Sequence, residues 1–284
     1  MVVLKNNDKL LKGLLDKRKF YEQVAKTKGD TDDYWAAGFY QSLLIEMIDH
    51  LLKDVDQRQI IDVGCGDGRT ALALVKQKNT VLGVDVAYTR LWRAQHKTAG
   101  HSSSTFFVQS YAESMPLKKE LFDGAICTEV LEHVLDDDAV LKELSYVLKP
   151  NAWVLMSIPT VSLSRYFDMR YTKQLIYFDP VEHVREFSYV KIPRFENAFV
   201  LIKDLKKKLR HYGFTVKNRY GVGFELPLGI RRFNVGRLCE NIYRNRKANK
   251  LFMKLPLVKN FGVYTVLILQ KVRHKPFNDH MRSQ

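Results

Sequence analysis

Two acids and a histidine stand close together in the stretch TEVLEHV, and another histidine follows in EHVREFS. Glu129 and Glu132 are three residues apart, and His133 comes four residues after Glu129. If this turn is helical, the three side chains share one face. A histidine or carboxylate there can act as a general base for an oxygen or nitrogen nucleophile. We therefore name Glu129, His133 and His183 as candidate catalytic residues.

The same residues allow two other interpretations. Glu129, Glu132, His133 and His183 together offer the oxygen and nitrogen ligands that bind Mg²⁺, Mn²⁺ or Zn²⁺. Alternatively, Glu132 and His133 belong to the scaffold and cap the loop in which they lie. The sequence leaves all three interpretations open, and we commit to no metal.

A second group of residues, in IIDVGCGDG, has the composition of a ligand-binding turn. Gly64, Gly66 and Gly68 alternate with single residues directly after an apolar stretch. Glycine adopts positive φ and lets a ligand approach the main chain closely. Asp85 ends the next apolar stretch, 21 residues after Gly64, where a carboxylate can accept both hydroxyls of a ribose. The lysine of a phosphate-binding G-K-[ST] loop is missing after these glycines.

The elements that would position these groups alternate along the chain. Strands are expected at Gln59–Val63, Thr80–Asp85, Thr105–Gln109, Phe122–Thr128 and Ala152–Ile158, and helices at Arg69–Gln77, Tyr88–Thr98 and Ala139–Leu148. This alternation predicts a largely parallel sheet with helices on both faces. The ligands of such sheets bind at the carboxyl ends of the strands.

The flanking segments are less regular. Residues 1–29 form a Lys-rich leader, expected to be helical in part, and residues 34–52 have helical spacing of apolar residues. Beyond a helix at Phe199–Tyr212, Phe214–Val222 and Val263–Val272 are strand-like. The insertion between these two strands predicts a basic amphipathic helix, with Leu238 and Ile242 on its apolar face.

Five stretches carry a resemblance to a known family. IIDVGCGDG, VLGVD, YAESMPL, FDGAICTEVLEHV and LKPNAWVLMSIP, in this order, resemble the successive motifs of class I S-adenosylmethionine-dependent methyltransferases. The resemblance implies a Rossmann-like sheet of seven strands, of which the last is antiparallel. It also implies one domain over 1–284, with an N-terminal helical lid (1–55), a cofactor-binding core (56–159), an acceptor-pocket segment (160–200) and a basic amphipathic insertion (224–260).

The resemblance further implies S-adenosylmethionine as cofactor and assigns roles to single residues. Gly64, Cys65 and Gly66 would present backbone to the methionine half, in a loop ordered by Asp62. Asp85 would hold the ribose, Val86 would lie against the adenine, and Ala112 and Glu113 would edge it. Thr128 and Glu129 would line the methyl-transfer cavity.

Two details refine this comparison. Tyr111 stands where many relatives have an Asp that bonds the adenine amino group, so we expect either that the backbone reads that edge or that the cofactor binds less tightly. E-x-x-E-H with a later histidine resembles the metal sites of quinone-pathway O-methyltransferases, and also those of enzymes that methylate the 3′-terminal ribose of small RNAs.

The charge distribution bears on the methyl acceptor. Residues 201–284 hold 20 Lys and Arg against 4 Asp and Glu, whereas residues 1–200 hold 26 against 27. A one-sided basic field attracts phosphates. We expect a small-molecule, glycan or lipid-linked acceptor, methylated on oxygen, with peripheral contact to an anionic membrane. The alternatives are an RNA methyltransferase that docks phosphates on the basic third, and a non-catalytic cofactor-binding scaffold.

Cysteine usage and hydropathy bear on the compartment. The three cysteines form no C-x-x-C pair, and no stretch has the pattern of a signal peptide or membrane span. We therefore expect a cytoplasmic protein with reduced thiols, placed peripherally on the inner face of a membrane if the basic insertion binds lipid.

Overall fold

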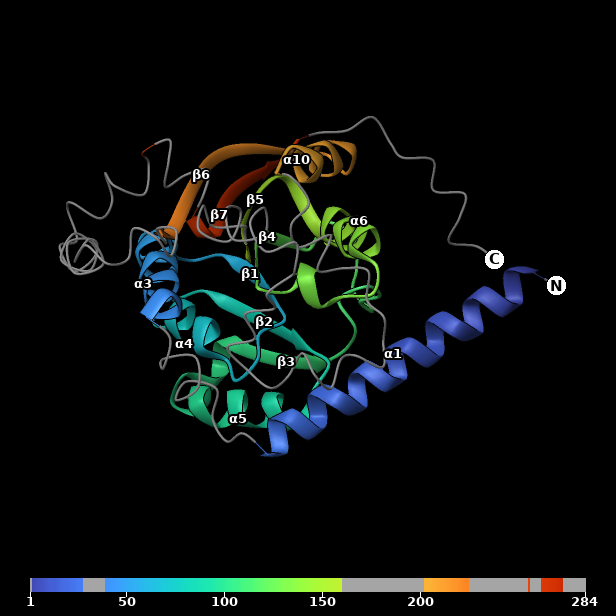
Figure 1. Cartoon of the computed structure of the whole chain (residues 1–284). Helices are drawn as coiled ribbons and strands as arrows, with labels where there is room; N and C mark the ends of the chain where they lie inside the picture. The colour runs from blue at the N-terminus through green and yellow to red at the C-terminus, as the bar shows by residue number, and fades with distance from the viewer. Residues whose placement is uncertain (1, 28–38, 160–201, 225–254, 256–261, 273–284) are drawn as a thin grey trace, which may run out of the picture.

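The chain folds around one seven-stranded sheet (Figure 1), as a computed structural model that describes residues 2–27, 39–159, 202–224, 255 and 262–272 shows. The strands are β1 (Gln59–Val63), β2 (Thr80–Asp85), β3 (Thr105–Gln109), β4 (Phe122–Thr128), β5 (Leu148–Pro159), β6 (Phe214–Phe224) and β7 (Gly262–Lys271). Their order is β3-β2-β1-β4-β5-β7-β6, and β7 runs in the direction opposite to the other six strands. The predicted sheet is therefore confirmed, including its antiparallel last strand.

Helices cover both faces of the sheet, because both faces of the central strands are apolar. On one face, α3 (Phe39–Leu52) and α4 (Arg69–Val75) pack against the strands. On the other face, α6 (Asp137–Val147) and α10 (Ile202–His211) enclose a second core. Figure 1 shows α3 and α4 on the side away from α6 and α10. The doubly covered sheet that the sequence predicts is confirmed.

The predicted helix ends differ from the observed ones by a few residues. Helix α5 (Tyr88–Thr98) matches its prediction. Helix α6 begins two residues before the predicted Ala139, because the Asp136 side chain accepts from the Ala139 N–H at 3.0 Å and caps the first turn. Helix α10 ends at His211, shortly before Gly213, which has a φ of 82°. Local capping residues therefore set the ends of α6 and α10, which the spacing of apolar residues alone does not determine.

The N-terminal leader forms a long helix, α1 (Val2–Thr27), that runs past the sheet and lies against α5 (Figure 1). Two contacts join it to α5. The Thr89 N–H and hydroxyl both donate to the Glu22 carboxylate, and the Arg93 guanidinium donates to the Ala25 carbonyl at 2.6 Å. From the sequence we expect this leader to be helical in part, but the sequence does not predict where the helix docks.

Some predictions concern residues outside those that the structure describes. These are the acceptor-pocket segment 160–200, which contains His183, and the basic insertion 224–260. Among the described helices, none is long and apolar enough to cross a membrane.

Candidate active site

The turn after β1 has the backbone that its glycines predicted. Gly64, Gly66 and Gly68 have φ of 69°, 52° and 76°, which L side chains rarely adopt. Packing also excludes a side chain at two of them. A Cβ on Gly64 would lie 2.5 Å from Val130 Cγ2, and one on Gly68 would lie 2.6 Å from Ala94 Cβ. The glycines therefore bring the turn close to the loop after β4 as well as exposing backbone.

The N–H groups of this turn are bonded within the protein. Gly64 and Cys65 both donate to the Val84 carbonyl, at 2.7 and 3.1 Å, and Gly66 donates to Asp85 Oδ2 at 3.0 Å. A phosphate cradle needs its N–H groups directed at the ligand. What this turn can offer a ligand is carbonyl oxygen, which attracts an ammonium group.

Asp85 accepts the hydrogen bonds that order the loop, a role that the family resemblance assigned to Asp62. Besides Gly66, Asp85 accepts from the Ala87 N–H at 2.8 Å. Burial raises the pKa of Asp85, and the nearby Arg90 opposes the rise. Asp62 is 2% exposed, and its Oδ2 has no hydrogen-bond partner within the described residues. Burial raises the pKa of Asp62 to about 8, so at neutral pH it is mostly a neutral acid.

Arg90 belongs to this site, although sequence reasoning missed it. Its Nη1 lies 3.6 Å from the position that a Cβ would take on Gly66. Its Nε is buried without a partner among the described residues. The signal was a cation in the first turn of the helix after Asp85, but helix periodicity does not say that this side chain turns toward the glycines.

The residues expected at the adenine edge lie in the loop after β3. Glu113 accepts from the Leu135 N–H at 2.8 Å, which ties this loop to the one after β4. The Tyr111 hydroxyl is buried without a partner among the described residues. Ala112 packs on the core, and Val86 lies half-buried just after β2. Glu113 therefore makes a structural bond in addition to the role expected of it at the adenine edge.

At the carboxyl end of β4, Glu129 stands on a strained backbone with φ 55°. The parallel register pairs Thr128 with Ser157 of β5. Ser157 is buried and donates through its hydroxyl to Glu129 Oε1 at 2.8 Å, and its carbonyl accepts from the Glu129 N–H at 3.2 Å. Sequence reasoning missed Ser157. Its signal was a polar residue at the carboxyl end of a buried strand.

Glu129–His133 do not form one helical turn, which was the condition for their side chains to share a face. Positive φ at Glu129 breaks the helix, and only Leu131–His133 form a short 3₁₀ turn, η2. Both Glu132 oxygens are buried, whereas the His133 side chain is 45% exposed. Glu132 Oε1 and His133 Nε2 are 3.9 Å apart. The two acids face inward together, and His133 lies at the rim.

Glu129 and Glu132 form a coupled acid pair. Burial raises the pKa of Glu129 to about 7, although hydrogen bonds with Ser157 and Glu132 oppose the rise. Burial and the neighbouring Glu129 raise the pKa of Glu132. Two carboxyl groups in one dry site share a proton, because both cannot ionise cheaply. At neutral pH, the pair can therefore accept a proton.

Metal ligation by Glu129, Glu132 and His133 has little geometric support. In the part of the chain that the structure describes, the one group with ligand atoms within 4.8 Å of one another is Asp136–Asp138. Asp136 caps α6, and Asp137 and Asp138 bond Lys208 at 2.9 and 3.0 Å. This group is explained by helix capping and an ion pair. The fourth candidate ligand, His183, lies outside the described residues.

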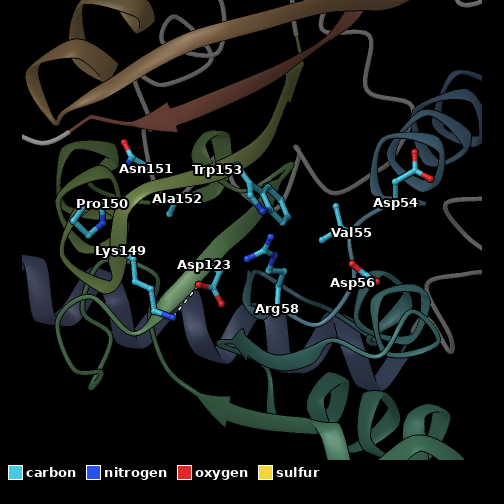
Figure 2. A pocket seen from close by; sticks show the side chains of 10 residues that line it. All are labelled: Asp54, Val55, Asp56, Arg58, Asp123, Lys149, Pro150, Asn151, Ala152 and Trp153. Atoms are coloured by element: carbon cyan, nitrogen blue, oxygen red, sulfur yellow. Dashed lines mark hydrogen bonds and ion pairs between the residues drawn. The ribbon is translucent and has the colours of Figure 1, made fainter.

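A cavity of about 390 Å³ lies at the opposite edge of the sheet, near the amino ends of β1, β4 and β5 (Figure 2). Its walls include Arg58, Trp153 and the ion pair of Lys149 with Asp123, which measures 2.8 Å. Figure 2 shows these side chains around the opening. The glycine turn and the acid pair are at the other ends of the same strands, so this cavity does not belong to the candidate active site.

The residues at the carboxyl edge fit S-adenosylmethionine. Carbonyl oxygens of the glycine turn suit its ammonium group, and the Arg90 guanidinium suits its carboxylate. Asp85 carries two oxygens with lone pairs left for ribose hydroxyls. Asp62 and Tyr111 each have a buried oxygen without a hydrogen-bond partner among the described residues, and a ligand can satisfy these polar groups.

Comparisons with known proteins agree with this cofactor. The family model described as "Methyltransferase domain" matches residues 61–156. A "Ubiquinone biosynthesis O-methyltransferase" of Hydrogenovibrio crunogenus is 26% identical over 76% of this chain and 85% of its own length. One with the same name from Leptothrix cholodnii is 29% identical, over 49% of this chain and 60% of its own length.

A solved structure adds the fold. A SAM-dependent methyltransferase from Thermotoga maritima, titled as a possible histamine N-methyltransferase, superposes with a TM-score of 0.51. It is 17% identical and covers 86% of this chain and 96% of its own, a likeness that concerns the fold alone. The site's chemistry and the matched domain supply the rest: residues 61–156 match a methyltransferase domain, the fold is that of class I enzymes, and the chain is an S-adenosylmethionine-dependent methyltransferase with S-adenosylmethionine as its cofactor.

Proposed function

We propose that the enzyme methylates an acidic hydroxyl, of the phenolic kind, on a small-molecule acceptor. The observation that carries this proposal is the buried Glu129–Glu132 pair, which lies next to the glycine turn through Val130. A phenol has a pKa near 10, as in tyrosine, so a base whose pKa is about 7 can take its proton. An aliphatic hydroxyl is a far weaker acid and is a poorer match.

In this proposal the chain's own residues position the acceptor and move one proton. Bound S-adenosylmethionine supplies an electrophilic methyl group on sulfur. Glu129 accepts the hydroxyl proton of the acceptor as the oxygen bonds to the methyl carbon and the carbon–sulfur bond breaks. Ser157 keeps the Glu129 carboxylate in place through its 2.8 Å bond. S-adenosylhomocysteine, the methylated acceptor and a protonated acid pair remain.

The cofactor roles assigned from the family resemblance remain part of the proposal. Gly64, Cys65 and Gly66 line the methionine half, and Asp85 holds the ribose. Val86, Ala112 and Glu113 flank the adenine, and Thr128 borders the transferred methyl. Because Asp85 orders the loop, the role proposed for Asp62 is a polar contact with the cofactor.

The two histidines have secondary roles in the proposal. His133, which is near the acid pair and partly exposed, can pass the proton from Glu132 to solvent. His183 remains a candidate from the sequence, in the segment 160–200 that we propose to form the acceptor pocket. The relatives named for ubiquinone biosynthesis act on oxygen, as their names state, and this supports an oxygen acceptor here.

The test is methyl transfer from labelled S-adenosylmethionine to matched acceptors. Catechol represents an acidic phenolic hydroxyl, methyl glucoside an aliphatic one, and total tRNA a nucleic acid. We expect label on catechol and little on the other two. Label on tRNA alone would replace this proposal with RNA methylation. Tight cofactor binding with no transfer to any acceptor would favour a non-catalytic scaffold.

We also propose peripheral contact with an anionic membrane through the basic insertion 224–260, on the sequence pattern alone. Such contact would suit an apolar phenol dissolved in lipid. Vesicles containing phosphatidylglycerol should sediment the protein, and replacing Arg237, Arg244 and Arg246 by Glu should abolish this. Equal sedimentation of both forms would contradict the proposal.

A further inference from the structure

Helix α1 crosses the carboxyl edge of the sheet between two attachments. Toward its start, Gly13 packs on the loop after η2, where an added Cβ would lie 3.0 Å from Leu135 Cδ1. Toward its end, Glu22 holds the Thr89 N–H at the start of α5. The first attachment is on the acceptor side and the second on the cofactor side. The helical turns between the two attachments therefore cover the place where the proposed acceptor and the cofactor must meet.

Tyr21 lies between these attachments, close to the second. Its ring meets the His133 ring edge-on, with centroids 6.1 Å apart at 83°, and packs likewise on Phe20 at 5.4 Å and 81°. The Tyr21 hydroxyl is buried. Edge-to-face contacts fix the orientation of a ring, so Tyr21 has little freedom to swing aside.

The surroundings of Tyr21 belong to both halves of the site. Asp85 and Arg90 of the cofactor side, and Glu132 of the acceptor side, all act electrostatically on its hydroxyl. Burial raises the pKa of Tyr21 far above its ordinary value, so its hydroxyl remains a neutral donor. A neutral donor among carboxylates can orient them without adding charge.

We propose that Tyr21 is a positioning residue for methyl transfer: its ring walls the junction of the cofactor and acceptor halves, and its hydroxyl orients the acceptor-side groups Glu132 and His133. The inference rests on the proposed function, because it assigns these two groups to the acceptor. In-line transfer requires the reacting atoms to be held within about 3–3.5 Å, with water excluded. A ring fixed by α1 meets both needs.

The experiment compares Tyr21→Phe, Tyr21→Ala and a control on the same helix, Leu15→Ala, whose side chain is exposed. Calorimetry measures the Kd of S-adenosylmethionine, and steady-state assays measure kcat and KM with catechol. The control should match the wild type. Tyr21→Phe keeps the wall, so its cofactor Kd should stay within about twofold while kcat falls about tenfold. Tyr21→Ala opens the wall, so kcat should fall about 100-fold and the cofactor Kd should rise about fivefold or more.

The split between Kd and kcat separates positioning from mere stability. If Tyr21→Phe keeps the wild-type kcat, the proposed role of the hydroxyl is wrong. If Tyr21→Ala also keeps the wild-type kcat, the proposed role of the ring as a wall is wrong as well. Should Tyr21→Ala fail to fold, Tyr21→Phe still decides the hydroxyl role. If the wild type binds the cofactor but methylates no phenol, the proposed function fails instead. In that case, an unchanged cofactor Kd in Tyr21→Ala would also contradict the proposal that the Tyr21 ring walls the cofactor half of the site.

Discussion

At the scale of single residues, the site is a set of acids kept in different states by their surroundings. Burial raises the pKa of Asp85. Arg90 and two backbone N–H groups oppose this rise, because they favour the charged form of the carboxyl group. Among the described residues, no cation near Asp62 or Glu129 offsets the effect of burial in this way. The pKa of Asp62 rises to about 8 and that of Glu129 to about 7. The surroundings thus give each acid its own set of interactions, and the proposal assigns ribose binding to Asp85 and proton transfer to Glu129.

Replacement of Asp85 tests the cofactor site. Asp85→Asn keeps the side-chain shape but loses the charge-assisted hydrogen bonds, so S-adenosylmethionine should bind about 1–3 kcal/mol more weakly by calorimetry. Asp123→Asn is the matched control, because Asp123 lies at the opposite edge in the cavity wall. Equal affinity in Asp85→Asn and the wild type would mean that the ribose lies elsewhere.

Replacement of Glu129 tests the base. Since the ionised form accepts the proton, kcat/KM with catechol should rise as pH increases through about 7. Glu129→Gln should lower kcat/KM by about 100-fold or more at pH 7.5 and should lose this rise, leaving only the increase from ionisation of the phenol itself. A profile from pH 6 to 9 that keeps its rise near 7 in this variant would assign the base to another group.

At the scale of elements, the turn after β1 works through close packing with its neighbours. Val130 of the loop after β4 fills the space beside Gly64, and the same loop carries the acid pair. Glu113 ties that loop to the one after β3. The glycine turn and the loop after β4 are therefore packed against each other.

Gly64→Ala should destabilise the protein by about 1–3 kcal/mol, because the Cβ meets Val130 and the residue must keep positive φ. Denaturant unfolding measures this change. Gly100→Ala is the control, since nothing lies within 4 Å of its added Cβ. Val130→Ala in the Gly64→Ala background should restore part of the loss, by removing the contact but not the strain. No rescue would assign the whole cost to the backbone.

At the scale of the whole molecule, the buried acids couple stability to pH. A carboxyl group with a raised pKa in the folded state keeps its proton where the unfolded chain has lost it. The folded state then binds more protons, so stability falls as pH rises between the unfolded and folded pKa values. The ionisation that activates the proposed base therefore costs folding free energy.

The free energy of unfolding should decrease as pH rises from about 4 to about 8, the interval set by Asp62 in the unfolded and folded states. Asp62→Asn should make this decrease shallower and raise stability at pH 8. Asp54→Asn, at an exposed carboxyl group, is the control. Denaturant titrations across the pH range measure both, and an unchanged slope in Asp62→Asn would show that Asp62 is ionised in the folded protein.

The sequence by itself determined the sheet and the location of the cofactor turn. Apolar strand runs, helical spacing and glycines next to an acid are local patterns. They predicted β1, β2, β3 and β4 to the residue and brought the right loops to one edge. Candidates such as Asp85 and Glu129 followed, because carboxyl ends of parallel strands share that edge.

Only the tertiary structure decided which side chains meet there. Asp85 rather than Asp62 accepts hydrogen bonds from the loop, positive φ at Glu129 prevents a helical turn there, and Ser157 of β5 bonds Glu129 at the end of the neighbouring β4. Tyr21 arrives from a helix more than 100 residues away in the chain from His133. Such contacts depend on docking and burial between distant segments, and local periodicity carries no information about either.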